Sequence, residues 1–268
     1  MRTIVHLSDL HFGRVDNRII GPLVARIAAL NPDLVAISGD LTQRARREQF
    51  LEARAFLDRL PFPKLVVPGN HDVPLFNVLA RLGDPLRGYR RHIDANIEPA
   101  IIDEEIAVIG LNSARGFVVG GRGRLNVAQI DHAVMMMRPL EPHLIKVIVT
   151  HHPFDLPPGF GHDHLIGRAR MAMARFASAG ADLFLSGHLH VSHVGHTAER
   201  YRIAGHSALI VQAGTLSTRG RGELNTFNVL RIARPDMTIE RYSWETGSEV
   251  FARSFEGKFR HTPDGWTA

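Results

Sequence analysis

Short apolar runs alternate with longer amphipathic stretches along the first two thirds of the chain. Six runs are typical of buried strands, at residues 3–8, 33–38, 64–68, 106–111, 144–150 and 182–186. Between several of them, apolar residues recur at spacings of three and four, which predicts helices over residues 19–30, 48–60, 127–137 and 165–177. Strands that alternate with helices favour parallel β-α-β crossovers and therefore an α/β fold.

The last part of the chain has a different pattern. Apolar runs at residues 208–215, 226–234 and 237–244 follow one another with turn residues and no helical pattern between them, as antiparallel strands do. We therefore expect a layered α/β sandwich whose second half adds a mixed or antiparallel sheet. A single domain is expected over residues 1–243, and residues 244–268 form a C-terminal extension that fits an arm, an edge strand or a dimer contact.

Composition adds limits to this picture. The 268 residues are 44% hydrophobic and 22% charged, which is ordinary for one globular domain with a sizeable core. The opening "MRTIVHLSDLHFG" has no apolar signal region, and no apolar run reaches about 18 residues, so a cytoplasmic, soluble protein is expected. The formal net charge is +5, but the arginines lie in small scattered groups, which favours solvated faces and attraction of anions over a nucleic-acid groove.

Polar side chains follow five of the predicted strands directly. In open α/β sheets the ligand crevice lies beyond the carboxyl ends of the strands, so these residues are the candidate site. The segments are Asp9-Leu10-His11, Gly39-Asp40, Gly69-Asn70-His71-Asp72, His151-His152 and Gly187-His188-Leu189-His190. The chain has no cysteine, so a metal would be held by oxygen and nitrogen donors, a mixture that suits manganese, iron or zinc.

Local geometry supports a shared site. Residues at i and i+2 of an extended backbone point to the same side, so both members of Asp-x-His or His-x-His are expected to reach one site. Gly39, Gly69 and Gly187 are expected to adopt positive φ, to let the chain turn sharply and to let it approach the site closely. Each motif alone is common in turns, but their ordered occurrence at strand ends favours a metal centre.

The ordered set "SDLH", "GDLT", "GNHD", "THH" and "GHLH" resembles the pattern of the calcineurin-like metallophosphoesterase superfamily. The segment "AGTLSTRGRGELNTFNVLRI" is similar to the C-terminal part of proteins in the bacterial branch that contains class III cyclic nucleotide phosphodiesterases and glycerophosphodiesterases. This resemblance implies a four-layer α/β-β/α sandwich with two mixed sheets flanked by helices. It also implies a dinuclear metal centre that hydrolyses phosphate esters.

The resemblance also implies the ligands. One metal would be held by Asp9, His11 and His190, the other by Asn70, His151 and His188, with Asp40 bridging the two. The residues alone do not decide which of His188 and His190 faces which ion, nor separate His151 from His152. The family pattern favours the first of the latter pair, which leaves His152 as a packing residue beside the ligands or a contact for substrate.

The expected reaction is hydrolysis of a small phosphodiester by a metal-bridging hydroxide. Two divalent ions, two aspartates and a hydroxide leave a net charge of about +1, which attracts a singly charged diester. His71 adjoins the ligand Asn70 without being needed for coordination, so it is expected to protonate the leaving group. Substrate contacts are expected from Asn70, His71, His152 and Arg219.

The sequence also bears on other members of the superfamily and on other substrates. Gln43 stands where protein phosphatases of the superfamily have an acidic residue, which disfavours phosphoprotein substrates, and the length leaves little room for the extra domain of the repair nucleases. A phospholipid headgroup or a nucleic acid remains an alternative substrate, and a non-enzymatic scaffold is disfavoured because every ligand position is filled. A homodimer is expected.

Overall fold

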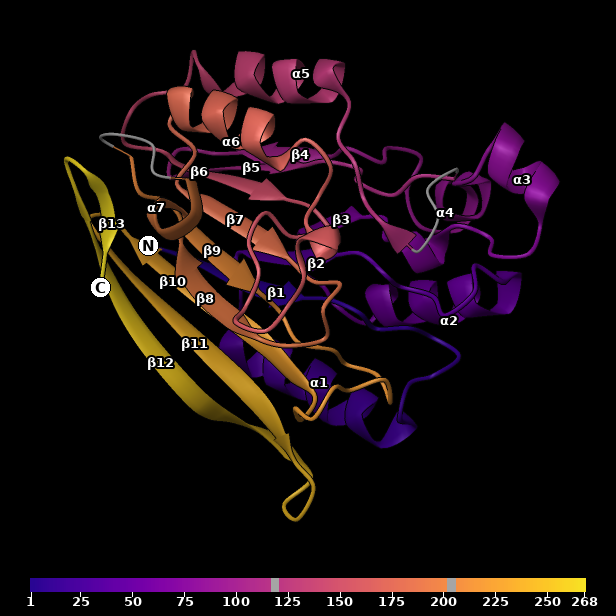
Figure 1. Cartoon of the computed structure of the whole chain (residues 1–268). Coiled ribbons are helices and arrows are strands. Elements are labelled where there is room, and N and C mark those ends of the chain that lie inside the picture. Colours follow the sequence, from indigo (N-terminus) through magenta and orange to yellow (C-terminus); the bar gives the residue numbers. More distant parts are fainter. Residues whose placement is uncertain (117–120, 202–205) are drawn as a thin grey trace.

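Two β-sheets lie face to face at the centre of the protein (Figure 1). The computed structural model describes residues 1–116, 121–201 and 206–268. Within these residues the larger sheet has seven strands in the order β13-β12-β11-β10-β1-β2-β3. The smaller sheet, counted over the same residues, has six strands in the order β4-β5-β6-β7-β9-β8.

Both sheets are mixed, as predicted. The larger sheet consists of β1 (Arg2–Leu7), β2 (Leu34–Ser38), β3 (Lys64–Val67), β10 (Thr226–Ala233), β11 (Asp236–Glu245), β12 (Val250–Thr262) and β13 (Gly265–Thr267). The smaller consists of β4 (Ala100–Ile102), β5 (Ile106–Gly110), β6 (Ile145–Val149), β7 (Leu183–Ser186), β8 (His193–His196) and β9 (Leu209–Gln212). Strands β1 to β3 are parallel, as are β5, β6, β7 and β9. Antiparallel neighbours are β10 beside β1, β4 beside β5 and β8 beside β9.

Helices cover the outer face of each sheet, so the molecule has the predicted four layers. One apolar layer between the sheets is built by residues of both, and each outer face packs its own apolar layer against helices. The helices on the larger sheet are α1 (Asn17–Leu30), α2 (Arg47–Asp58) and α4 (Arg87–His92), and those on the smaller are α5 (Val127–Met137) and α6 (Ala169–Ser178). The short helices are α3 (Val78–Gly83), α7 (Thr197–Tyr201), η1 (Asn70–Asp72) and η3 (His162–His164). None of the described helices is long and apolar enough to cross a membrane.

One predicted helix starts too early. The pattern predicts a helix over residues 165–177, whereas α6 begins at Ala169. The preceding residues use their amide groups elsewhere, because Ile166 donates to the Pro153 carbonyl and Gly167 donates to the Gly123 carbonyl. Arg168 then has a φ of 69°, which interrupts any helix before Ala169.

The predicted antiparallel run at the end of the chain is wrong in one respect. Of the three predicted runs, β10 and β11 pair with each other in antiparallel fashion, whereas β9 belongs to the smaller sheet, where it lies parallel to β7. Between β9 and β10 the chain crosses from one sheet to the other. Apolar alternation does not reveal this crossing, since the choice of a strand's partner depends on contacts far away in the sequence.

The final residues extend the larger sheet. Strand β12 pairs with β11 along its length and β13 pairs with the end of β12, so a boundary at residue 243 lies inside β11. Trp266 is buried, and its indole N–H donates to Asp182 Oδ1 at 3.1 Å. This bond connects the C-terminal strand to the residue that precedes β7 in the smaller sheet. The dimer contact stays a prediction.

Candidate metal centre

The carboxyl ends of parallel strands from both sheets meet at one edge of the molecule (Figure 1). Strands β1, β2 and β3 of the larger sheet end there, together with β6 and β7 of the smaller sheet. The polar residues that follow these strands come together, as the position of strand ends predicts. They are Asp9, His11, Asp40, Asn70, His151, His188 and His190.

Four of these side chains form one buried group. His190 Nε2 lies 3.1 Å from Asp9 Oδ1, and His11 Nε2 lies 3.5 Å from the same oxygen. Asp40 Oδ2 lies 3.6 Å from His11 Nε2, and all four side chains are buried. Two carboxylates with two imidazoles are a donor set suited to manganese, iron or zinc.

A second group shares Asp40 with the first. His151 Nε2 lies 3.3 Å from Asp40 Oδ2 and 3.0 Å from Asn70 Oδ1, and His188 Nδ1 lies 3.1 Å from the same amide oxygen. The structure therefore separates the two histidines that the sequence leaves undecided, placing His188 here and His190 in the first group. Asp40 Oδ2 is within reach of both groups, so Asp40 could bridge two ions.

Backbone carbonyls orient two of the imidazole rings. His151 Nδ1 donates to the Ser38 carbonyl at 2.8 Å, and His190 Nδ1 donates to the Arg219 carbonyl at 2.9 Å. A carbonyl oxygen only accepts, so each ring carries a proton on Nδ1. In both residues Nε2 is thus the atom that can coordinate a metal, in the arrangement by which proteins commonly orient ligand histidines.

The buried carboxylates make this edge attractive to cations. Burial alone would lower the pKa of His151, but the Asp40 carboxylate beside it raises that pKa to about 9. Burial would likewise raise the pKa of Asp9, whereas His190 and His11 hold it well below its usual value. The carboxylates stay ionised and favour positive charge next to them, which divalent ions supply while the imidazoles remain neutral.

One carboxylate oxygen shows that the residues fit a metal. Asp9 Oδ2 accepts from the Ser8 hydroxyl at 2.7 Å and from the His188 amide at 2.9 Å. Asp9 Oδ1 is buried and accepts no hydrogen bond from the described residues. A buried carboxylate oxygen without a partner is costly, and coordination of a cation removes that cost.

The ligand loops do not have the extended backbone that the spacing predicts. Asp9, His11, His188 and His190 have φ values of 53°, 46°, 72° and 59°, all in the left-handed region. Such a conformation costs roughly 1 kcal/mol or more for a residue other than glycine and tends to occur at functional sites. Hydrogen bonds between loops help to hold it, among them the bond from the Asp9 amide to the Gly39 carbonyl.

The three glycines of the motifs have two different reasons. Gly39 has a φ of 89°, as predicted, but Gly69 and Gly187 do not have positive φ. They do allow the predicted close approach, because a Cβ on Gly69 would lie 2.1 Å from Asp40 Oδ1 and one on Gly187 would lie 1.8 Å from Ser8 Oγ. The prediction of positive φ is therefore wrong for these two positions.

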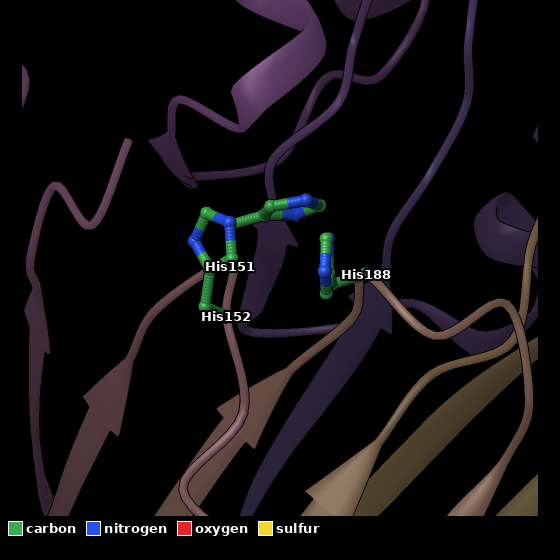
Figure 2. Close-up of side chains that lie close together, drawn as sticks. All are labelled: His151, His152 and His188. Atoms are coloured by element: carbon green, nitrogen blue, oxygen red, sulfur yellow. The ribbon is translucent and has the colours of Figure 1, made fainter. Parts of the chain in front are cut away.

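His152 lies beside the second group with both ring nitrogens engaged. Figure 2 shows its ring next to those of His151 and His188, beyond the ends of the smaller sheet's strands. His152 Nδ1 lies 2.8 Å from the Ser113 hydroxyl, and Nε2 donates to the Gly121 carbonyl at 2.7 Å. Neither nitrogen remains for a substrate oxygen, so the geometry favours the packing role over the substrate contact.

His71 and Arg219 face the groups from the open side. His71 Nδ1 donates to the Gln43 carbonyl at 2.8 Å, which turns Nε2 toward the site. Arg219 Nη1 lies 2.9 Å from His71 Nε2 and 3.3 Å from His11 Nε2. Burial lowers the pKa of His71. The backbone of Gln43 thus orients His71, although its side chain is not acidic.

Asp72, the last of the strand-end residues after β3, is a positioning residue. Its carboxylate accepts from the amides of Leu41, Thr42 and Gly69 at 3.2, 2.9 and 2.9 Å. Burial and the nearby Asp40 raise the pKa of Asp72 to about 7. By joining the loops after β2 and β3, Asp72 holds Asp40 and Asn70 in place, and the fourth letter of "GNHD" is the signal for it.

Comparisons with known proteins agree with this geometry. The sequence model of the family described as calcineurin-like phosphoesterase matches residues 2–192. A curated protein, the glycerophosphodiester phosphodiesterase GpdQ of Enterobacter lignolyticus, is 34% identical over 80 residues. That match covers 26% of this chain and 29% of the relative, so it spans under a third of the relative's length.

Two solved structures share the fold over nearly the whole chain. A dimetal phosphatase from Danio rerio has a TM-score of 0.69 at 13% identity, covering 97% of this chain and 99% of its own. Purple acid phosphatase PPD1 from yellow lupin seeds has a TM-score of 0.71 at 10% identity, covering 95% of this chain and 53% of its own. With the family match over residues 2–192 and the ligand groups at the strand ends, the chain belongs to the calcineurin-like phosphoesterase family.

Proposed function

We propose that this chain hydrolyses a phosphodiester, of the size class of a cyclic nucleotide or a glycerophosphodiester, with two ions of manganese, iron or zinc. The observation that carries the proposal is the position of Asp40 Oδ2, 3.6 Å from His11 Nε2 and 3.3 Å from His151 Nε2. One carboxylate shared between two sets of donors is the arrangement of a two-metal hydrolase. The partial likeness to a glycerophosphodiester phosphodiesterase supports a diester as substrate.

Each ion would have its own ligands besides the shared Asp40. The ligand sets are Asp9, His11 and His190 for one ion and Asn70, His151 and His188 for the other. When bound, such a pair supplies an activated water and positive charge for the phosphoryl oxygens. The carbonyls of Ser38 and Arg219 keep the ligand rings oriented, and Asp72 keeps the ligand loops together.

His71 would supply the proton that the leaving alcohol needs. Its Nδ1 is engaged by the Gln43 carbonyl, so Nε2 is the atom that can donate to a departing alkoxide. Arg219 now donates to that nitrogen, but a substrate phosphoryl group is a stronger acceptor for a guanidinium. If Arg219 shifts to the phosphoryl group, His71 Nε2 becomes free to take up a proton from water, and the resulting imidazolium could then donate that proton to the departing alkoxide.

Replacing Arg219 with lysine is expected to raise KM by roughly tenfold to a hundredfold, because an ammonium group cannot hold a phosphoryl group at two points. Initial rates over a range of aryl diester concentrations separate KM from kcat. Arg221→Lys is the matched control, since Arg221 is exposed two residues away. An unchanged KM for Arg219→Lys would remove Arg219 from the substrate site.

Removal of bound metal by a chelator is expected to abolish diester hydrolysis, and addition of Mn²⁺ should restore it, because the side chains alone hold no activated nucleophile. Elemental analysis of the purified protein should find close to two ions per chain at full activity. Activity that survives in protein shown to hold no metal would contradict the proposal.

A nucleic-acid substrate remains the second candidate for this reaction centre. Binding of an oligonucleotide would weaken steeply with salt, because each phosphate contact releases counterions. A small-diester enzyme should bind a single-stranded oligonucleotide too weakly to measure at about 0.15 M salt. The scattered arginines of the sequence favour the small diester.

A further inference from the structure

A cleft extends from the candidate metal centre toward helix α3. It encloses about 570 Å³, and Asn70 and His71 line it at the end nearest the metal ligands. Leu75, Val78 and Leu82 line it on the side of α3. A cleft of this volume is within the range of pockets that bind small organic ligands. It is continuous with the reaction centre, so whatever fills it is attached to or lies beside the substrate phosphate.

Leu75, Val78 and Leu82 form the apolar wall of the cleft, and the segment of residues 75–82 that contains them is unusually apolar for a surface. Phe76 and Leu79 are each 82% exposed, and Val78 and Leu82 are 62% and 52% exposed. Helix α3 has no buried residue and stands at the periphery of the molecule (Figure 1). These side chains therefore add little to the protein's core, and an exposed apolar cluster of this kind usually marks a binding surface.

The segment is nonetheless held in place by specific bonds. Arg81 Nε donates to the Gly116 carbonyl at 2.8 Å, and Arg81 Nη1 donates to the Leu75 carbonyl at 3.2 Å. Asn77 Oδ1 accepts from the Ala80 amide at 3.0 Å and caps the helix. Bonds that fix an exposed apolar wall beside a reaction centre indicate a role in binding rather than in folding.

The polar side of the cleft suits an anionic group. Arg44 lines the cleft near His71, and its guanidinium forms no ion pair with any described residue. Arg219 Nη1 lies 2.9 Å from His71 Nε2. Arg81 and Arg115 line the cleft as well, so cationic groups and the apolar side chains of the α3 segment share its wall. That combination suits a molecule with a phosphate head and an aliphatic chain.

We infer that the cleft binds an aliphatic chain of the substrate, which makes the preferred substrate class a lipid-like phosphodiester. The inference rests on the proposed phosphodiesterase function, and among phosphodiesters it favours the phospholipid alternative over a cyclic nucleotide or an unacylated glycerophosphodiester. A ribose or glycerol substituent offers few apolar groups to bury against Leu75 and Val78. An alkyl or acyl chain would bury apolar surface along its whole length, and it would also remove the apolar surface of the wall from water.

Binding of alkylphosphonates tests the inference without requiring turnover. The dissociation constants of methyl-, butyl- and octylphosphonate are measured by calorimetry on the metal-loaded protein. Each added methylene is expected to tighten binding by roughly twofold or more until the cleft is filled. Leu75→Ser combined with Val78→Ser should flatten this dependence on chain length. Met135→Ser, which changes a side chain 65% exposed on α5, is the matched control and should keep it.

Two results would overturn the inference. One is a dissociation constant independent of chain length in the unaltered protein, and the other is a dependence that the double variant leaves intact. Sedimentation of the same variants tests whether the apolar wall joins two copies of the chain. If the double variant dissociates a dimer but leaves the dependence on chain length unaltered, the wall is a dimer contact and not a substrate site. Hydrolysis of methyl p-nitrophenyl phosphate is measured separately, and its absence would contradict the proposed function alone.

Discussion

Replacing Asp40 with asparagine is expected to lower kcat/KM for an aryl phosphodiester by roughly a thousandfold, the scale on which loss of a central electrostatic group reduces catalysis. Asparagine has nearly the same shape, so the change removes charge from a side chain that is 1% exposed. Without that charge, Oδ2 no longer offers a shared anionic ligand between His11 and His151. The kinetics and the metal content of the same preparation are measured, and both kcat/KM and the number of bound ions per chain should fall.

The control for this change is an aspartate on the surface. Asp264 lies in the exposed turn between β12 and β13, and Asp264→Asn should leave both rate and metal content unchanged. Full occupancy by two ions together with near-normal activity in Asp40→Asn would rule out a bridging role for Asp40. A loss of activity with an unfolded far-ultraviolet spectrum would instead call for the milder Asp40→Glu.

Replacing His71 with alanine is expected to reduce hydrolysis of alkyl diesters by roughly a hundredfold to ten-thousandfold, the usual contribution of a general acid. An aryl diester should be affected much less, because nitrophenolate leaves without being protonated. The difference between the two substrates is the informative quantity, since a change that merely disturbed the site would slow both alike. Rates for the two diesters with one enzyme preparation give this ratio.

An exposed histidine serves as the control for His71. His132 lies on the outer side of α5, and His132→Ala should preserve the ratio of alkyl to aryl rates. Equal losses on both substrates in His71→Ala would leave His71 as an orienting residue that acts through Arg219, 2.9 Å away. Wild-type rates on the alkyl diester would exclude the acid role altogether.

Much of the central architecture could be predicted because its pattern is local. Helix α5 has the predicted bounds, and the central strands lie within a residue or two of the predicted runs. The short strand β8 and helix α3 were not predicted, since each is too short to show a period. The membership of β9 in the smaller sheet could not be predicted either, because it depends on pairing with β7, which lies far away in the sequence.

The sequence by itself determined the chemistry available at one edge of the sheets. Strand ends within a parallel sheet lie at the same edge, so the carboxylates and the amide after β1, β2 and β3 are expected together, and so are the imidazoles after β6 and β7. Without cysteine, those groups limit a metal to oxygen and nitrogen ligands. These conclusions need only the order of residues along the chain.

Only the tertiary structure decided how those groups are used. It separates His188 from His190, engages both nitrogens of His152, and brings Arg219 against His71 from 148 residues away. It also places the apolar wall of α3 beside the reaction centre. The physical reason is that ring orientation, hydrogen-bond partners and exposure depend on atoms from several distant segments, which no local pattern of residues specifies.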